Sequence, residues 1–206
     1  LRARAEAGDG AAQFALGLMY ATGDRVAEDE AEAFRWLGLA TKQLDALEGL
    51  RLRAEQGNAD AQYTLGFMYA TGEVVEQDEA EALQWLRLAA EQGDRRGQNG
   101  LGVMYITGLG VPKDAAEALR WFRLSAEQGY VGGQNNLGFS YRNGVGVSQD
   151  HREAARWFRL SAEQGHADAQ FALAVGFAEG LGVSQDDVQS YLWYTVAYVT
   201  YRTGDE

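Results

Sequence analysis

The tetrapeptide AEQG decides the fold of this chain, because it returns at a fixed interval. It occupies residues 54–57, 90–93, 126–129 and 162–165, so successive copies lie 36 residues apart. A related string, AEAG, occupies residues 5–8 and precedes the next copy by 49 residues, which is one period plus 13. Self-similarity at a period of roughly 20–50 residues is typical of solenoids and other repeat arrays. The sequence therefore predicts a single array over residues 1–206.

Each period reads as two helices joined by a loop. In the second repeat, Leu65 and Met68 lie on one face of a first helix, the string ATG interrupts the pattern, and Ala82, Trp85 and Leu86 define a second helix. AEQG is then the turn between repeats, and its glycine is expected to adopt the positive φ that ends a helix. The predicted repeats span residues 5–40, 54–89, 90–125, 126–161 and 162–197, with a capping extension at 198–206.

The 13 extra residues at 41–53 form a helical insertion between the first two repeats. A stripe of apolar residues at spacings of three and four continues through it, including Leu44 and Leu47. Two interpretations remain open, an extended second helix or an additional helix. The first residues, LRARAEAG, resemble the end of a repeat, so we expect the chain to begin within a repeat of something longer.

Acidic residues mark the start of every second helix. An aspartate followed three residues later by Glu or Gln predicts a capping box, in which the two residues satisfy each other's free backbone N–H groups. Paired catalytic carboxylates are the alternative, but five copies in phase favour the cap. The pairs are Asp29 and Glu32, Asp78 and Glu81, Asp114 and Glu117, Asp150 and Glu153, and Asp186 and Gln189.

One tryptophan and one glycine also recur in phase. A large ring at the same helical position in each repeat predicts a core residue, with a ligand-stacking ladder as the alternative. A glycine inside a helix predicts close approach of another helix, which offsets its low helix propensity. The residues are Trp36, Trp85, Trp121, Trp157 and Trp193, and Gly17, Gly66, Gly102 and Gly138.

Written as A-E-x-G…A-x-L-G-x-x-Y…G-x-G-V…D…A-x-x-W-x-x-x-A, the chain resembles the Sel1-like repeat (SLR) proteins, relatives of the tetratricopeptide repeats. The resemblance implies an all-α, right-handed solenoid of antiparallel helix pairs that acts as an adaptor for protein partners. Arg25 and Val74 depart from it at the second glycine of G-x-G-V, and Ala174 and Phe177 depart from it in the last repeat. The absence of cysteine excludes the cysteine-stapled branch of the family.

Function is expected on the first helices, which line the concave surface of tetratricopeptide arrays. Alignment on L-G-x-x-Y predicts a lining that varies between repeats and joins apolar anchors to amide and guanidinium groups, as a bound peptide would need. The alternative is that some of these side chains pack against neighbouring repeats. The predicted partner-binding residues are Phe14, Leu18, Tyr63, Phe67, Asn99, Val103, Ile106, Asn135, Phe139, Arg142, Asn143, Phe171 and Val175.

Tyr191, Tyr194, Tyr198 and Tyr201 form a stripe along the last helix. The stripe either caps the array or forms an edge, through which the chain forms a homo-oligomer or a further element docks.

Composition excludes several classes of partner. The formal net charge is −12, and counting Lys and Arg against Asp and Glu gives −5, −6, +1, +1 and −5 over the five repeats in order. An acidic chain without a dense basic stripe is not expected to bind nucleic acid. No apolar run reaches the roughly 20 residues of a membrane span, so no membrane insertion is expected. The compartment, cytoplasm or periplasm, is left open.

Catalysis is not expected. His151 and His166 are the two histidines, both at polar, loop-like positions, and no Ser, metal or phosphate-binding constellation accompanies them. We therefore predict no catalytic residues, no metal and no cofactor. The predicted function is a protein–protein interaction scaffold or adaptor. The alternatives are a small-ligand-binding or enzyme-like solenoid, and a self-assembling structural array.

Overall fold

The computed structural model describes residues 1–22, 26, 29–72 and 75–204, and within them the chain is a succession of α-helices. It divides into two compact units, Leu1–Asp78 and Glu79–Glu206. In both units, helices that are consecutive in the sequence pack against each other. The predicted all-α solenoid of helix pairs is therefore confirmed.

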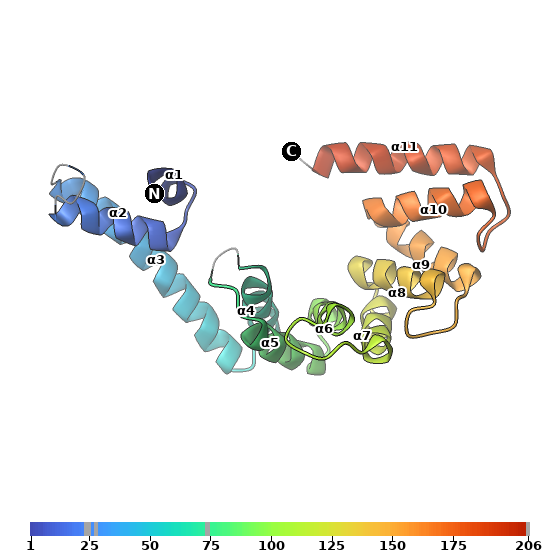
Figure 1. Ribbon diagram of the computed structural model, residues 1–206, viewed down its shortest axis with the longest axis horizontal. Coiled ribbons are helices and arrows are strands. Elements are labelled where there is room, and N and C mark those ends of the chain that lie inside the picture. Colours follow the sequence, from blue (N-terminus) through green and yellow to red (C-terminus); the bar gives the residue numbers. More distant parts are fainter. Residues whose placement is uncertain (23–25, 27–28, 73–74, 205–206) are drawn as a thin grey trace. The chain divides into compact units, whose positions relative to one another are not determined.

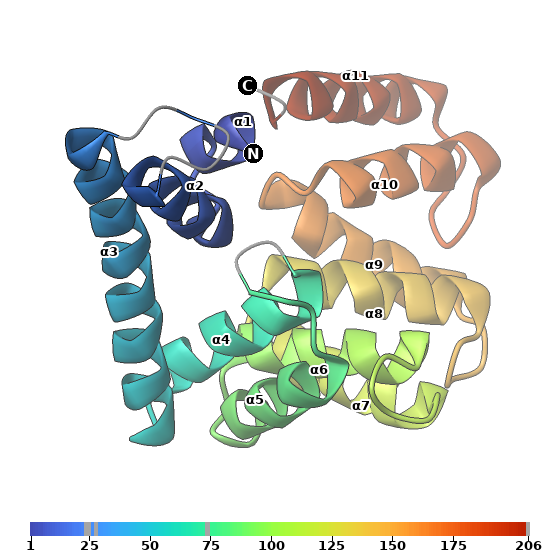
Figure 2. The same cartoon turned by 60° about the vertical axis from the view of Figure 1, so that its left-hand side comes forward.

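The first unit contains α1 (Arg2–Glu6), α2 (Gly10–Thr22), α3 (Glu30–Glu55) and α4 (Ala59–Thr71). The residues of the insertion lie inside α3, which runs without interruption for 26 residues. The structure thus has the extended second helix. Figures 1 and 2 show α2 beside the N-terminal half of α3 and α4 at its C-terminal end.

The described residues of the second unit form seven helices, of which the first six have 13 residues each. Its first helices are α6, α8 and α10, and its second helices are α5, α7, α9 and α11; α11 is longer, with 18 residues (Figure 1). The helices of the second unit have these bounds: α5 (Glu79–Glu91), α6 (Arg95–Thr107), α7 (Ala115–Glu127), α8 (Val131–Asn143), α9 (His151–Glu163), α10 (Ala167–Glu179) and α11 (Asp187–Gly204).

The glycine of AEQG controls the length of the second helices. Gly93, Gly129 and Gly165 have φ values of 89°, 77° and 91°, in the left-handed region that other residues avoid, and a second helix ends just before each one. In register with them, the chain has Leu44 in the first repeat and Tyr201 in the last. Because neither residue favours a positive φ, α3 and α11 continue past the point where the other second helices end.

The predicted capping boxes are half formed. Asp114 and Asp150 accept hydrogen bonds from the backbone N–H groups two and three residues later, as expected of an N-cap. The reciprocal half of the prediction is wrong, because the N–H of Asp114 donates to the carbonyl of Tyr105 at 3.0 Å. In the first repeat the glutamate makes a different contact. The carboxylate of Glu32 accepts a hydrogen bond from the indole N–H of Trp36 at 2.7 Å.

The recurring tryptophans and helical glycines belong to the core, as predicted. Trp36, Trp85, Trp121 and Trp157 are buried, which argues against a ligand-stacking ladder, and Trp193 is half-buried. A Cβ atom on Gly102 would lie 2.6 Å from the Phe122 ring, and one on Gly138 would lie 2.7 Å from the Phe158 ring. The helices therefore approach too closely for any side chain at these positions.

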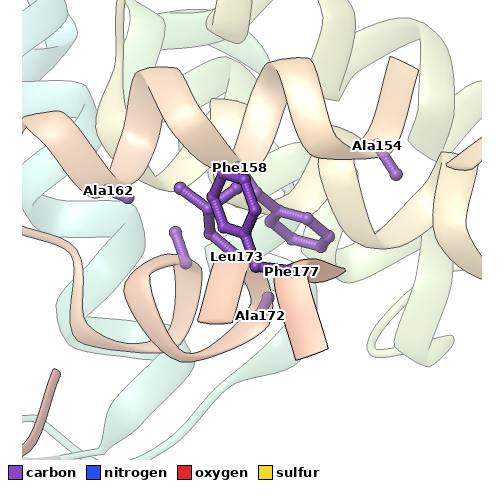
Figure 3. Packing of buried hydrophobic residues seen from close by; sticks show 7 residues of the cluster. Ala154, Phe158, Ala162, Ala172, Leu173 and Phe177 are labelled. Atoms are coloured by element: carbon purple, nitrogen blue, oxygen red, sulfur yellow. The ribbon is translucent and has the colours of Figure 1, made fainter. Parts of the chain in front are cut away.

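Neighbouring repeats share their apolar cores. Figure 3 shows Phe158 of α9 meeting Leu173 and Phe177 of α10, with Ala154, Ala162 and Ala172 around them. The second helices α7 and α9 thus pack both on the first helix of their own repeat and on that of the next. This arrangement fixes which side of α6, α8 and α10 stays open to a partner.

The G-x-G-V loops are structural as well. A Cβ on Gly110 would lie 2.5 Å from the carbonyl oxygen of Glu79, and the same clash arises between Gly146 and Ala115 and between Gly182 and His151. The second glycine is therefore required where the loop crosses the start of the preceding second helix. Arg25 and Val74, which replace it in the first two repeats, lie outside the described residues.

Candidate functional site

The first helices bury one row of side chains that the repeats keep. Leu101 of α6, Leu137 of α8 and Leu173 of α10 are almost fully buried at the same repeat position. Three residues before each leucine is a glutamine that is also buried. The predicted partner-binding residues lie in the rows beside this one, on α2, α4, α6, α8 and α10. These rows change from repeat to repeat, and we call them the first-helix face.

The buried glutamines form a hydrogen-bonded network that the sequence reasoning missed. The amide of Gln170 donates to the carbonyl of Ala162 at 3.2 Å and accepts from the hydroxyl of Thr200 at 2.8 Å. Gln134 repeats this pattern with Ala126 and with Gln164. The recurrence of glutamine three residues before the first-helix leucine was the available signal. The network joins each repeat to the next and is structural.

The asparagines of the first-helix face do not form one continuous row. Asn99 of α6 accepts a hydrogen bond from Asn136 of α8 at 2.9 Å, and Asn136 was not predicted. Asn135, which was predicted, is buried, and its side-chain oxygen has no hydrogen-bond partner among the described residues. Asn143 is exposed at the end of α8. The structure therefore joins Asn99 to Asn136 and leaves Asn135 enclosed.

Several predicted apolar residues of this face also support the core. Val103 and Ile106 are half-buried against the cluster that contains Phe122, and Phe139 is half-buried with its ring 5.2 Å from that of Phe158. For these residues the packing interpretation holds at least in part.

Three phenylalanine residues on the described first helices remain almost half exposed. Phe171 on α10 is 48% exposed and meets Tyr194 edge-on, with ring centroids 5.4 Å apart. In the first unit, Phe67 on α4 is 47% exposed and lies 6.1 Å from Tyr63, while Phe14 on α2 is 49% exposed. Rings this exposed are available to a partner. The side chain of Leu18 lies outside the described part of the structure.

The predicted lining is interrupted in the first unit. Both α2 and α4 pack on α3, but they lie towards opposite ends of that long helix (Figure 2). Phe14 is therefore not brought beside Tyr63 and Phe67 as a regular stack of repeats would require. The insertion in α3 is the physical cause of this separation.

Arg142 is the single charged residue of α8. It is half-buried, and its guanidinium carbon lies 4.4 Å from the centre of the Phe139 ring and 5.6 Å from that of Phe158. Burial lowers the pKa of Arg142 below its ordinary value. The side chain thus combines a positive charge with an apolar, aromatic setting.

The cavity beside Arg142 is too small for a substrate. Its volume is about 20 Å³, room for roughly one water molecule, whereas small-molecule sites usually exceed about 300 Å³. No carboxylate lines it. The lining residues are Arg142, His151, Ala154, Ala155, Phe158, Ala172, Leu173, Val175, Gly176 and Leu181.

The other histidine gives no support for a catalytic site. His166 precedes α10, and its Nδ1 is buried without a hydrogen-bond partner among the described residues. No cluster of three or more potential metal ligands occurs in residues 1–22, 26, 29–72 and 75–204.

The tyrosine stripe of α11 is divided between contacts and solvent. Tyr201 donates a hydrogen bond to Asp168 of α10, which raises the pKa of Tyr201 to about 12. Tyr194 packs on Phe171, as described above. Tyr191 and Tyr198 point away from these contacts and are 72% and 61% exposed. Capping and an open edge are therefore both present on one helix.

Comparison with known proteins identifies the repeat. The Sel1 repeat model matches residues 10–43, 59–94, 95–130, 131–166 and 167–198, and each match begins five residues after the boundary expected from AEQG. The chain belongs to the Sel1 repeat family. Sel1 repeat proteins generally mediate protein–protein interactions and are typically scaffolds without enzymatic activity. A search of the curated proteins gives no match.

Two solved structures of bacterial proteins resemble the Sel1 array closely. The protective antigen c5321 of uropathogenic Escherichia coli, which has an SLR fold, is 38% identical with a TM-score of 0.68. The match covers 97% of this chain and 40% of that one, so the chain spans less than half of its relative. A Sel1 repeat protein from Oxalobacter formigenes is 31% identical with a TM-score of 0.67, covering 93% of this chain and 71% of that one.

A more distant structure shares the fold alone. The immunity protein Pa5087 from Pseudomonas aeruginosa is 21% identical with a TM-score of 0.53, covering 95% of this chain and 70% of that one. Among the described residues, no helix has the length and apolar character required to cross a membrane.

Proposed function

We propose that this Sel1 repeat chain is a scaffold or adaptor that binds a segment of another protein on its first-helix face. In the second unit this face comprises the rows of α6, α8 and α10 that contain Asn99, Phe139, Arg142 and Phe171. Phe67 of the first unit belongs to the corresponding row of α4.

One observation carries this proposal. The residues that the repeats keep, such as Leu101 and Leu137, are buried, whereas the rows that vary contain aromatic rings almost half exposed to water. Stability alone does not favour large exposed rings, because their apolar surface stabilises the protein only when it is covered. Phe67 and Phe171 are the residues that would gain most from a partner, and aromatic anchors are common among the residues that dominate binding energy.

The polar groups of the face would serve the backbone of the bound segment. A peptide that docks without secondary structure needs donors and acceptors for its N–H and C=O groups, because leaving them buried and unpaired costs about 1–3 kcal/mol each. Asn99 and Asn136 are half-buried on neighbouring helices and already orient each other. Asn135 is enclosed and supplies such a contact only if its side chain turns.

The test compares binding by two variants, each of which replaces two partly exposed apolar side chains with serine. In the face variant, Phe67→Ser is combined with Phe171→Ser. In the control, Leu124→Ser is combined with Leu160→Ser on the second helices α7 and α9, where the two leucines are 38% and 37% exposed. Circular dichroism and thermal melting establish that both variants are folded before use.

Each variant is immobilised beside the wild type and exposed to lysate of the source organism, and retained proteins are identified by mass spectrometry. We expect a protein that the wild type and the control retain and the face variant loses. A partner retained by the face variant but lost by the control would place binding on the second helices and contradict the proposal.

Self-association is the second candidate, favoured by the exposed side of α11. Its residues are each at least half exposed and recur at spacings of three, four and seven, which places them on one side of that helix: Val188, Tyr191, Leu192, Tyr198 and Val199. A continuous apolar strip of this kind is typical of an interface. We propose it as an alternative site at which two copies of the chain meet.

A further inference from the structure

The guanidinium of Arg142 is held in an unusual setting between the C-terminal end of α8 and the first residues of α9. The rings of Phe139 and Phe158 lie under it at 4.4 Å and 5.6 Å. Ala154 and Val175 line the same cavity with apolar side chains, and His151 contributes its one other polar side chain. A planar guanidinium that stacks on aromatic rings keeps its N–H edge free for another ligand.

No acidic group of the described residues neutralises this charge. Arg96 pairs with Asp94 at 2.7 Å, and Arg156 pairs with Glu153 at 3.2 Å. For Arg142 no ion pair exists among the described residues, and burial is the only influence on its pKa. A partly buried charge without a counter-charge is unfavourable. A carboxylate placed against it would therefore be bound more strongly than by a fully exposed arginine.

The charge distribution of the chain favours the same ligand at this place. The repeats at 90–125 and 126–161 each carry a net charge of +1, whereas the other three carry −5 or −6. An acidic segment would therefore be repelled by most of the chain and attracted to the region of α6 to α9. At the position of Arg142 the other repeats have Ala21, Ala70, Ile106 and Ala178, so the site occurs once.

We infer that Arg142 binds a carboxylate of the protein segment that docks on the first-helix face, and that this contact fixes the register of the segment. The inference rests on the proposed function and adds the chemistry of the partner. The carboxylate belongs to an Asp or Glu side chain or to a chain terminus. The planar fork of the guanidinium suits either source, because it donates two parallel hydrogen bonds to the two oxygens.

The experiment uses three peptide probes and NMR of the full chain with ¹⁵N-labelled arginine. The probes are acetyl-Leu-Glu-Leu-amide, acetyl-Leu-Gln-Leu-amide, and acetyl-Leu-Gln-Leu with a free terminal carboxylate. We expect at least one carboxylate probe to shift the Nε–H resonance of Arg142 and to bind about tenfold or more tightly than the neutral amide. The stronger of the two carboxylate probes identifies the source of the group.

Two variants and a control separate the guanidinium from general charge. Arg142→Gln should abolish the preference for carboxylate, and Arg142→Lys should lose most of it, since lysine keeps the charge but not the fork. Arg123→Gln on α7 is the control, because Arg123 is exposed and donates to the hydroxyl of Tyr141 at 3.1 Å. It should leave the preference unchanged.

Equal affinities for the charged and neutral probes would overturn the inference, as would an Arg142 resonance that no carboxylate probe shifts. Survival of the preference in Arg142→Gln would have the same consequence. None of these outcomes touches the proposed function, because its test alters Phe67 and Phe171 and leaves Arg142 in place. A loss of partner binding that is equal in the face variant and its control would instead count against the proposed function.

Discussion

At the scale of single residues, glycines in the helices carry the packing of the array. A helical glycine destabilises a helix by about 1 kcal/mol relative to alanine. Gly138 is nevertheless required, because the Phe158 ring of the paired helix fills the space where a Cβ would lie. The last repeat has Ala174 at the equivalent position, and there the paired helix presents Tyr194, whose ring contacts Phe171. Glycine thus pairs with a buried phenylalanine in the repeats at 90–125 and 126–161, whereas Gly17 of the first repeat faces Leu37.

Gly138→Ala is expected to destabilise the protein by about 1–3 kcal/mol, because an added methyl group overpacks the contact with Phe158. Gly38→Ala is the matched control. Gly38 also lies in a helix, α3, but nothing lies within 4 Å of the position of its Cβ, so alanine should stabilise by up to about 1 kcal/mol. Chemical denaturation of both variants measures the two effects. If both substitutions changed the free energy of unfolding in the same direction, the packing argument would be contradicted.

At the scale of single helices, the ends are set by local groups that recur through the chain. Asp94 caps α6 by accepting hydrogen bonds from the backbone N–H groups of Arg96 and Gly97 at 2.9 Å and 2.8 Å, and its carboxylate also binds the Arg96 guanidinium. Burial by itself would raise the pKa of Asp94, but these hydrogen bonds outweigh burial and lower the pKa. The equivalent residue before α4 is Asn58, which also caps through its side-chain oxygen.

Asp94→Asn should therefore keep the cap but lose the charge-assisted part of it, at a cost of about 1 kcal/mol at pH 7. A carboxyl whose pKa is lowered by folding stabilises the native state above its unfolded pKa of about 3.9, and this contribution disappears as the pH falls through the folded value. The melting temperatures of wild type and variant should thus differ at pH 7 and converge near the acid limit. A difference that persists in acid would refute this account.

At the scale of the whole molecule, exposed apolar side chains of the described residues lie in several places. Separated rings lie on the first helices, a strip lies along α11, and Leu88, Leu124 and Leu160 share one repeat position of the second helices. In α7 and α9, the positions that face the next repeat are buried, including Phe122 and Phe158. In α11 the residue equivalent to Phe158 is Tyr194, which is 39% exposed. The corresponding side is therefore open in α11 and buried in the other second helices of this unit.

Tyr191→Ser combined with Tyr198→Ser is expected to abolish concentration-dependent association of the chain. Both tyrosines lie on α11 and are mostly exposed, so their removal should affect the folded monomer little. Light scattering over a wide range of protein concentration measures the mass of wild type and variant. If the wild type remains monomeric throughout, α11 is not a self-association site. The Leu124→Ser/Leu160→Ser variant controls for exposed apolar area in general.

The sequence by itself determined the period, the two helices of each repeat, the turn at AEQG, the aspartate caps and the tryptophan core. These features depend on contacts within a repeat or between equivalent positions of adjacent repeats. The same residue pattern therefore recurs in several repeats and can be recognised in the sequence. Even the uninterrupted α3 has a local cause, because Leu44 stands where the turn requires glycine.

Only the tertiary structure decided which residues of the first-helix face are open. Asn135 and Phe171 occupy the same repeat position, yet Asn135 is buried and Phe171 is 48% exposed. The sequence likewise did not predict the hydrogen bond between Asn99 and Asn136, or that Arg142 has no ion pair among the described residues. The reason is physical: side-chain burial and ion pairing depend on distances between helices that are far apart in sequence, and helical periodicity fixes only the direction in which each side chain leaves its own helix.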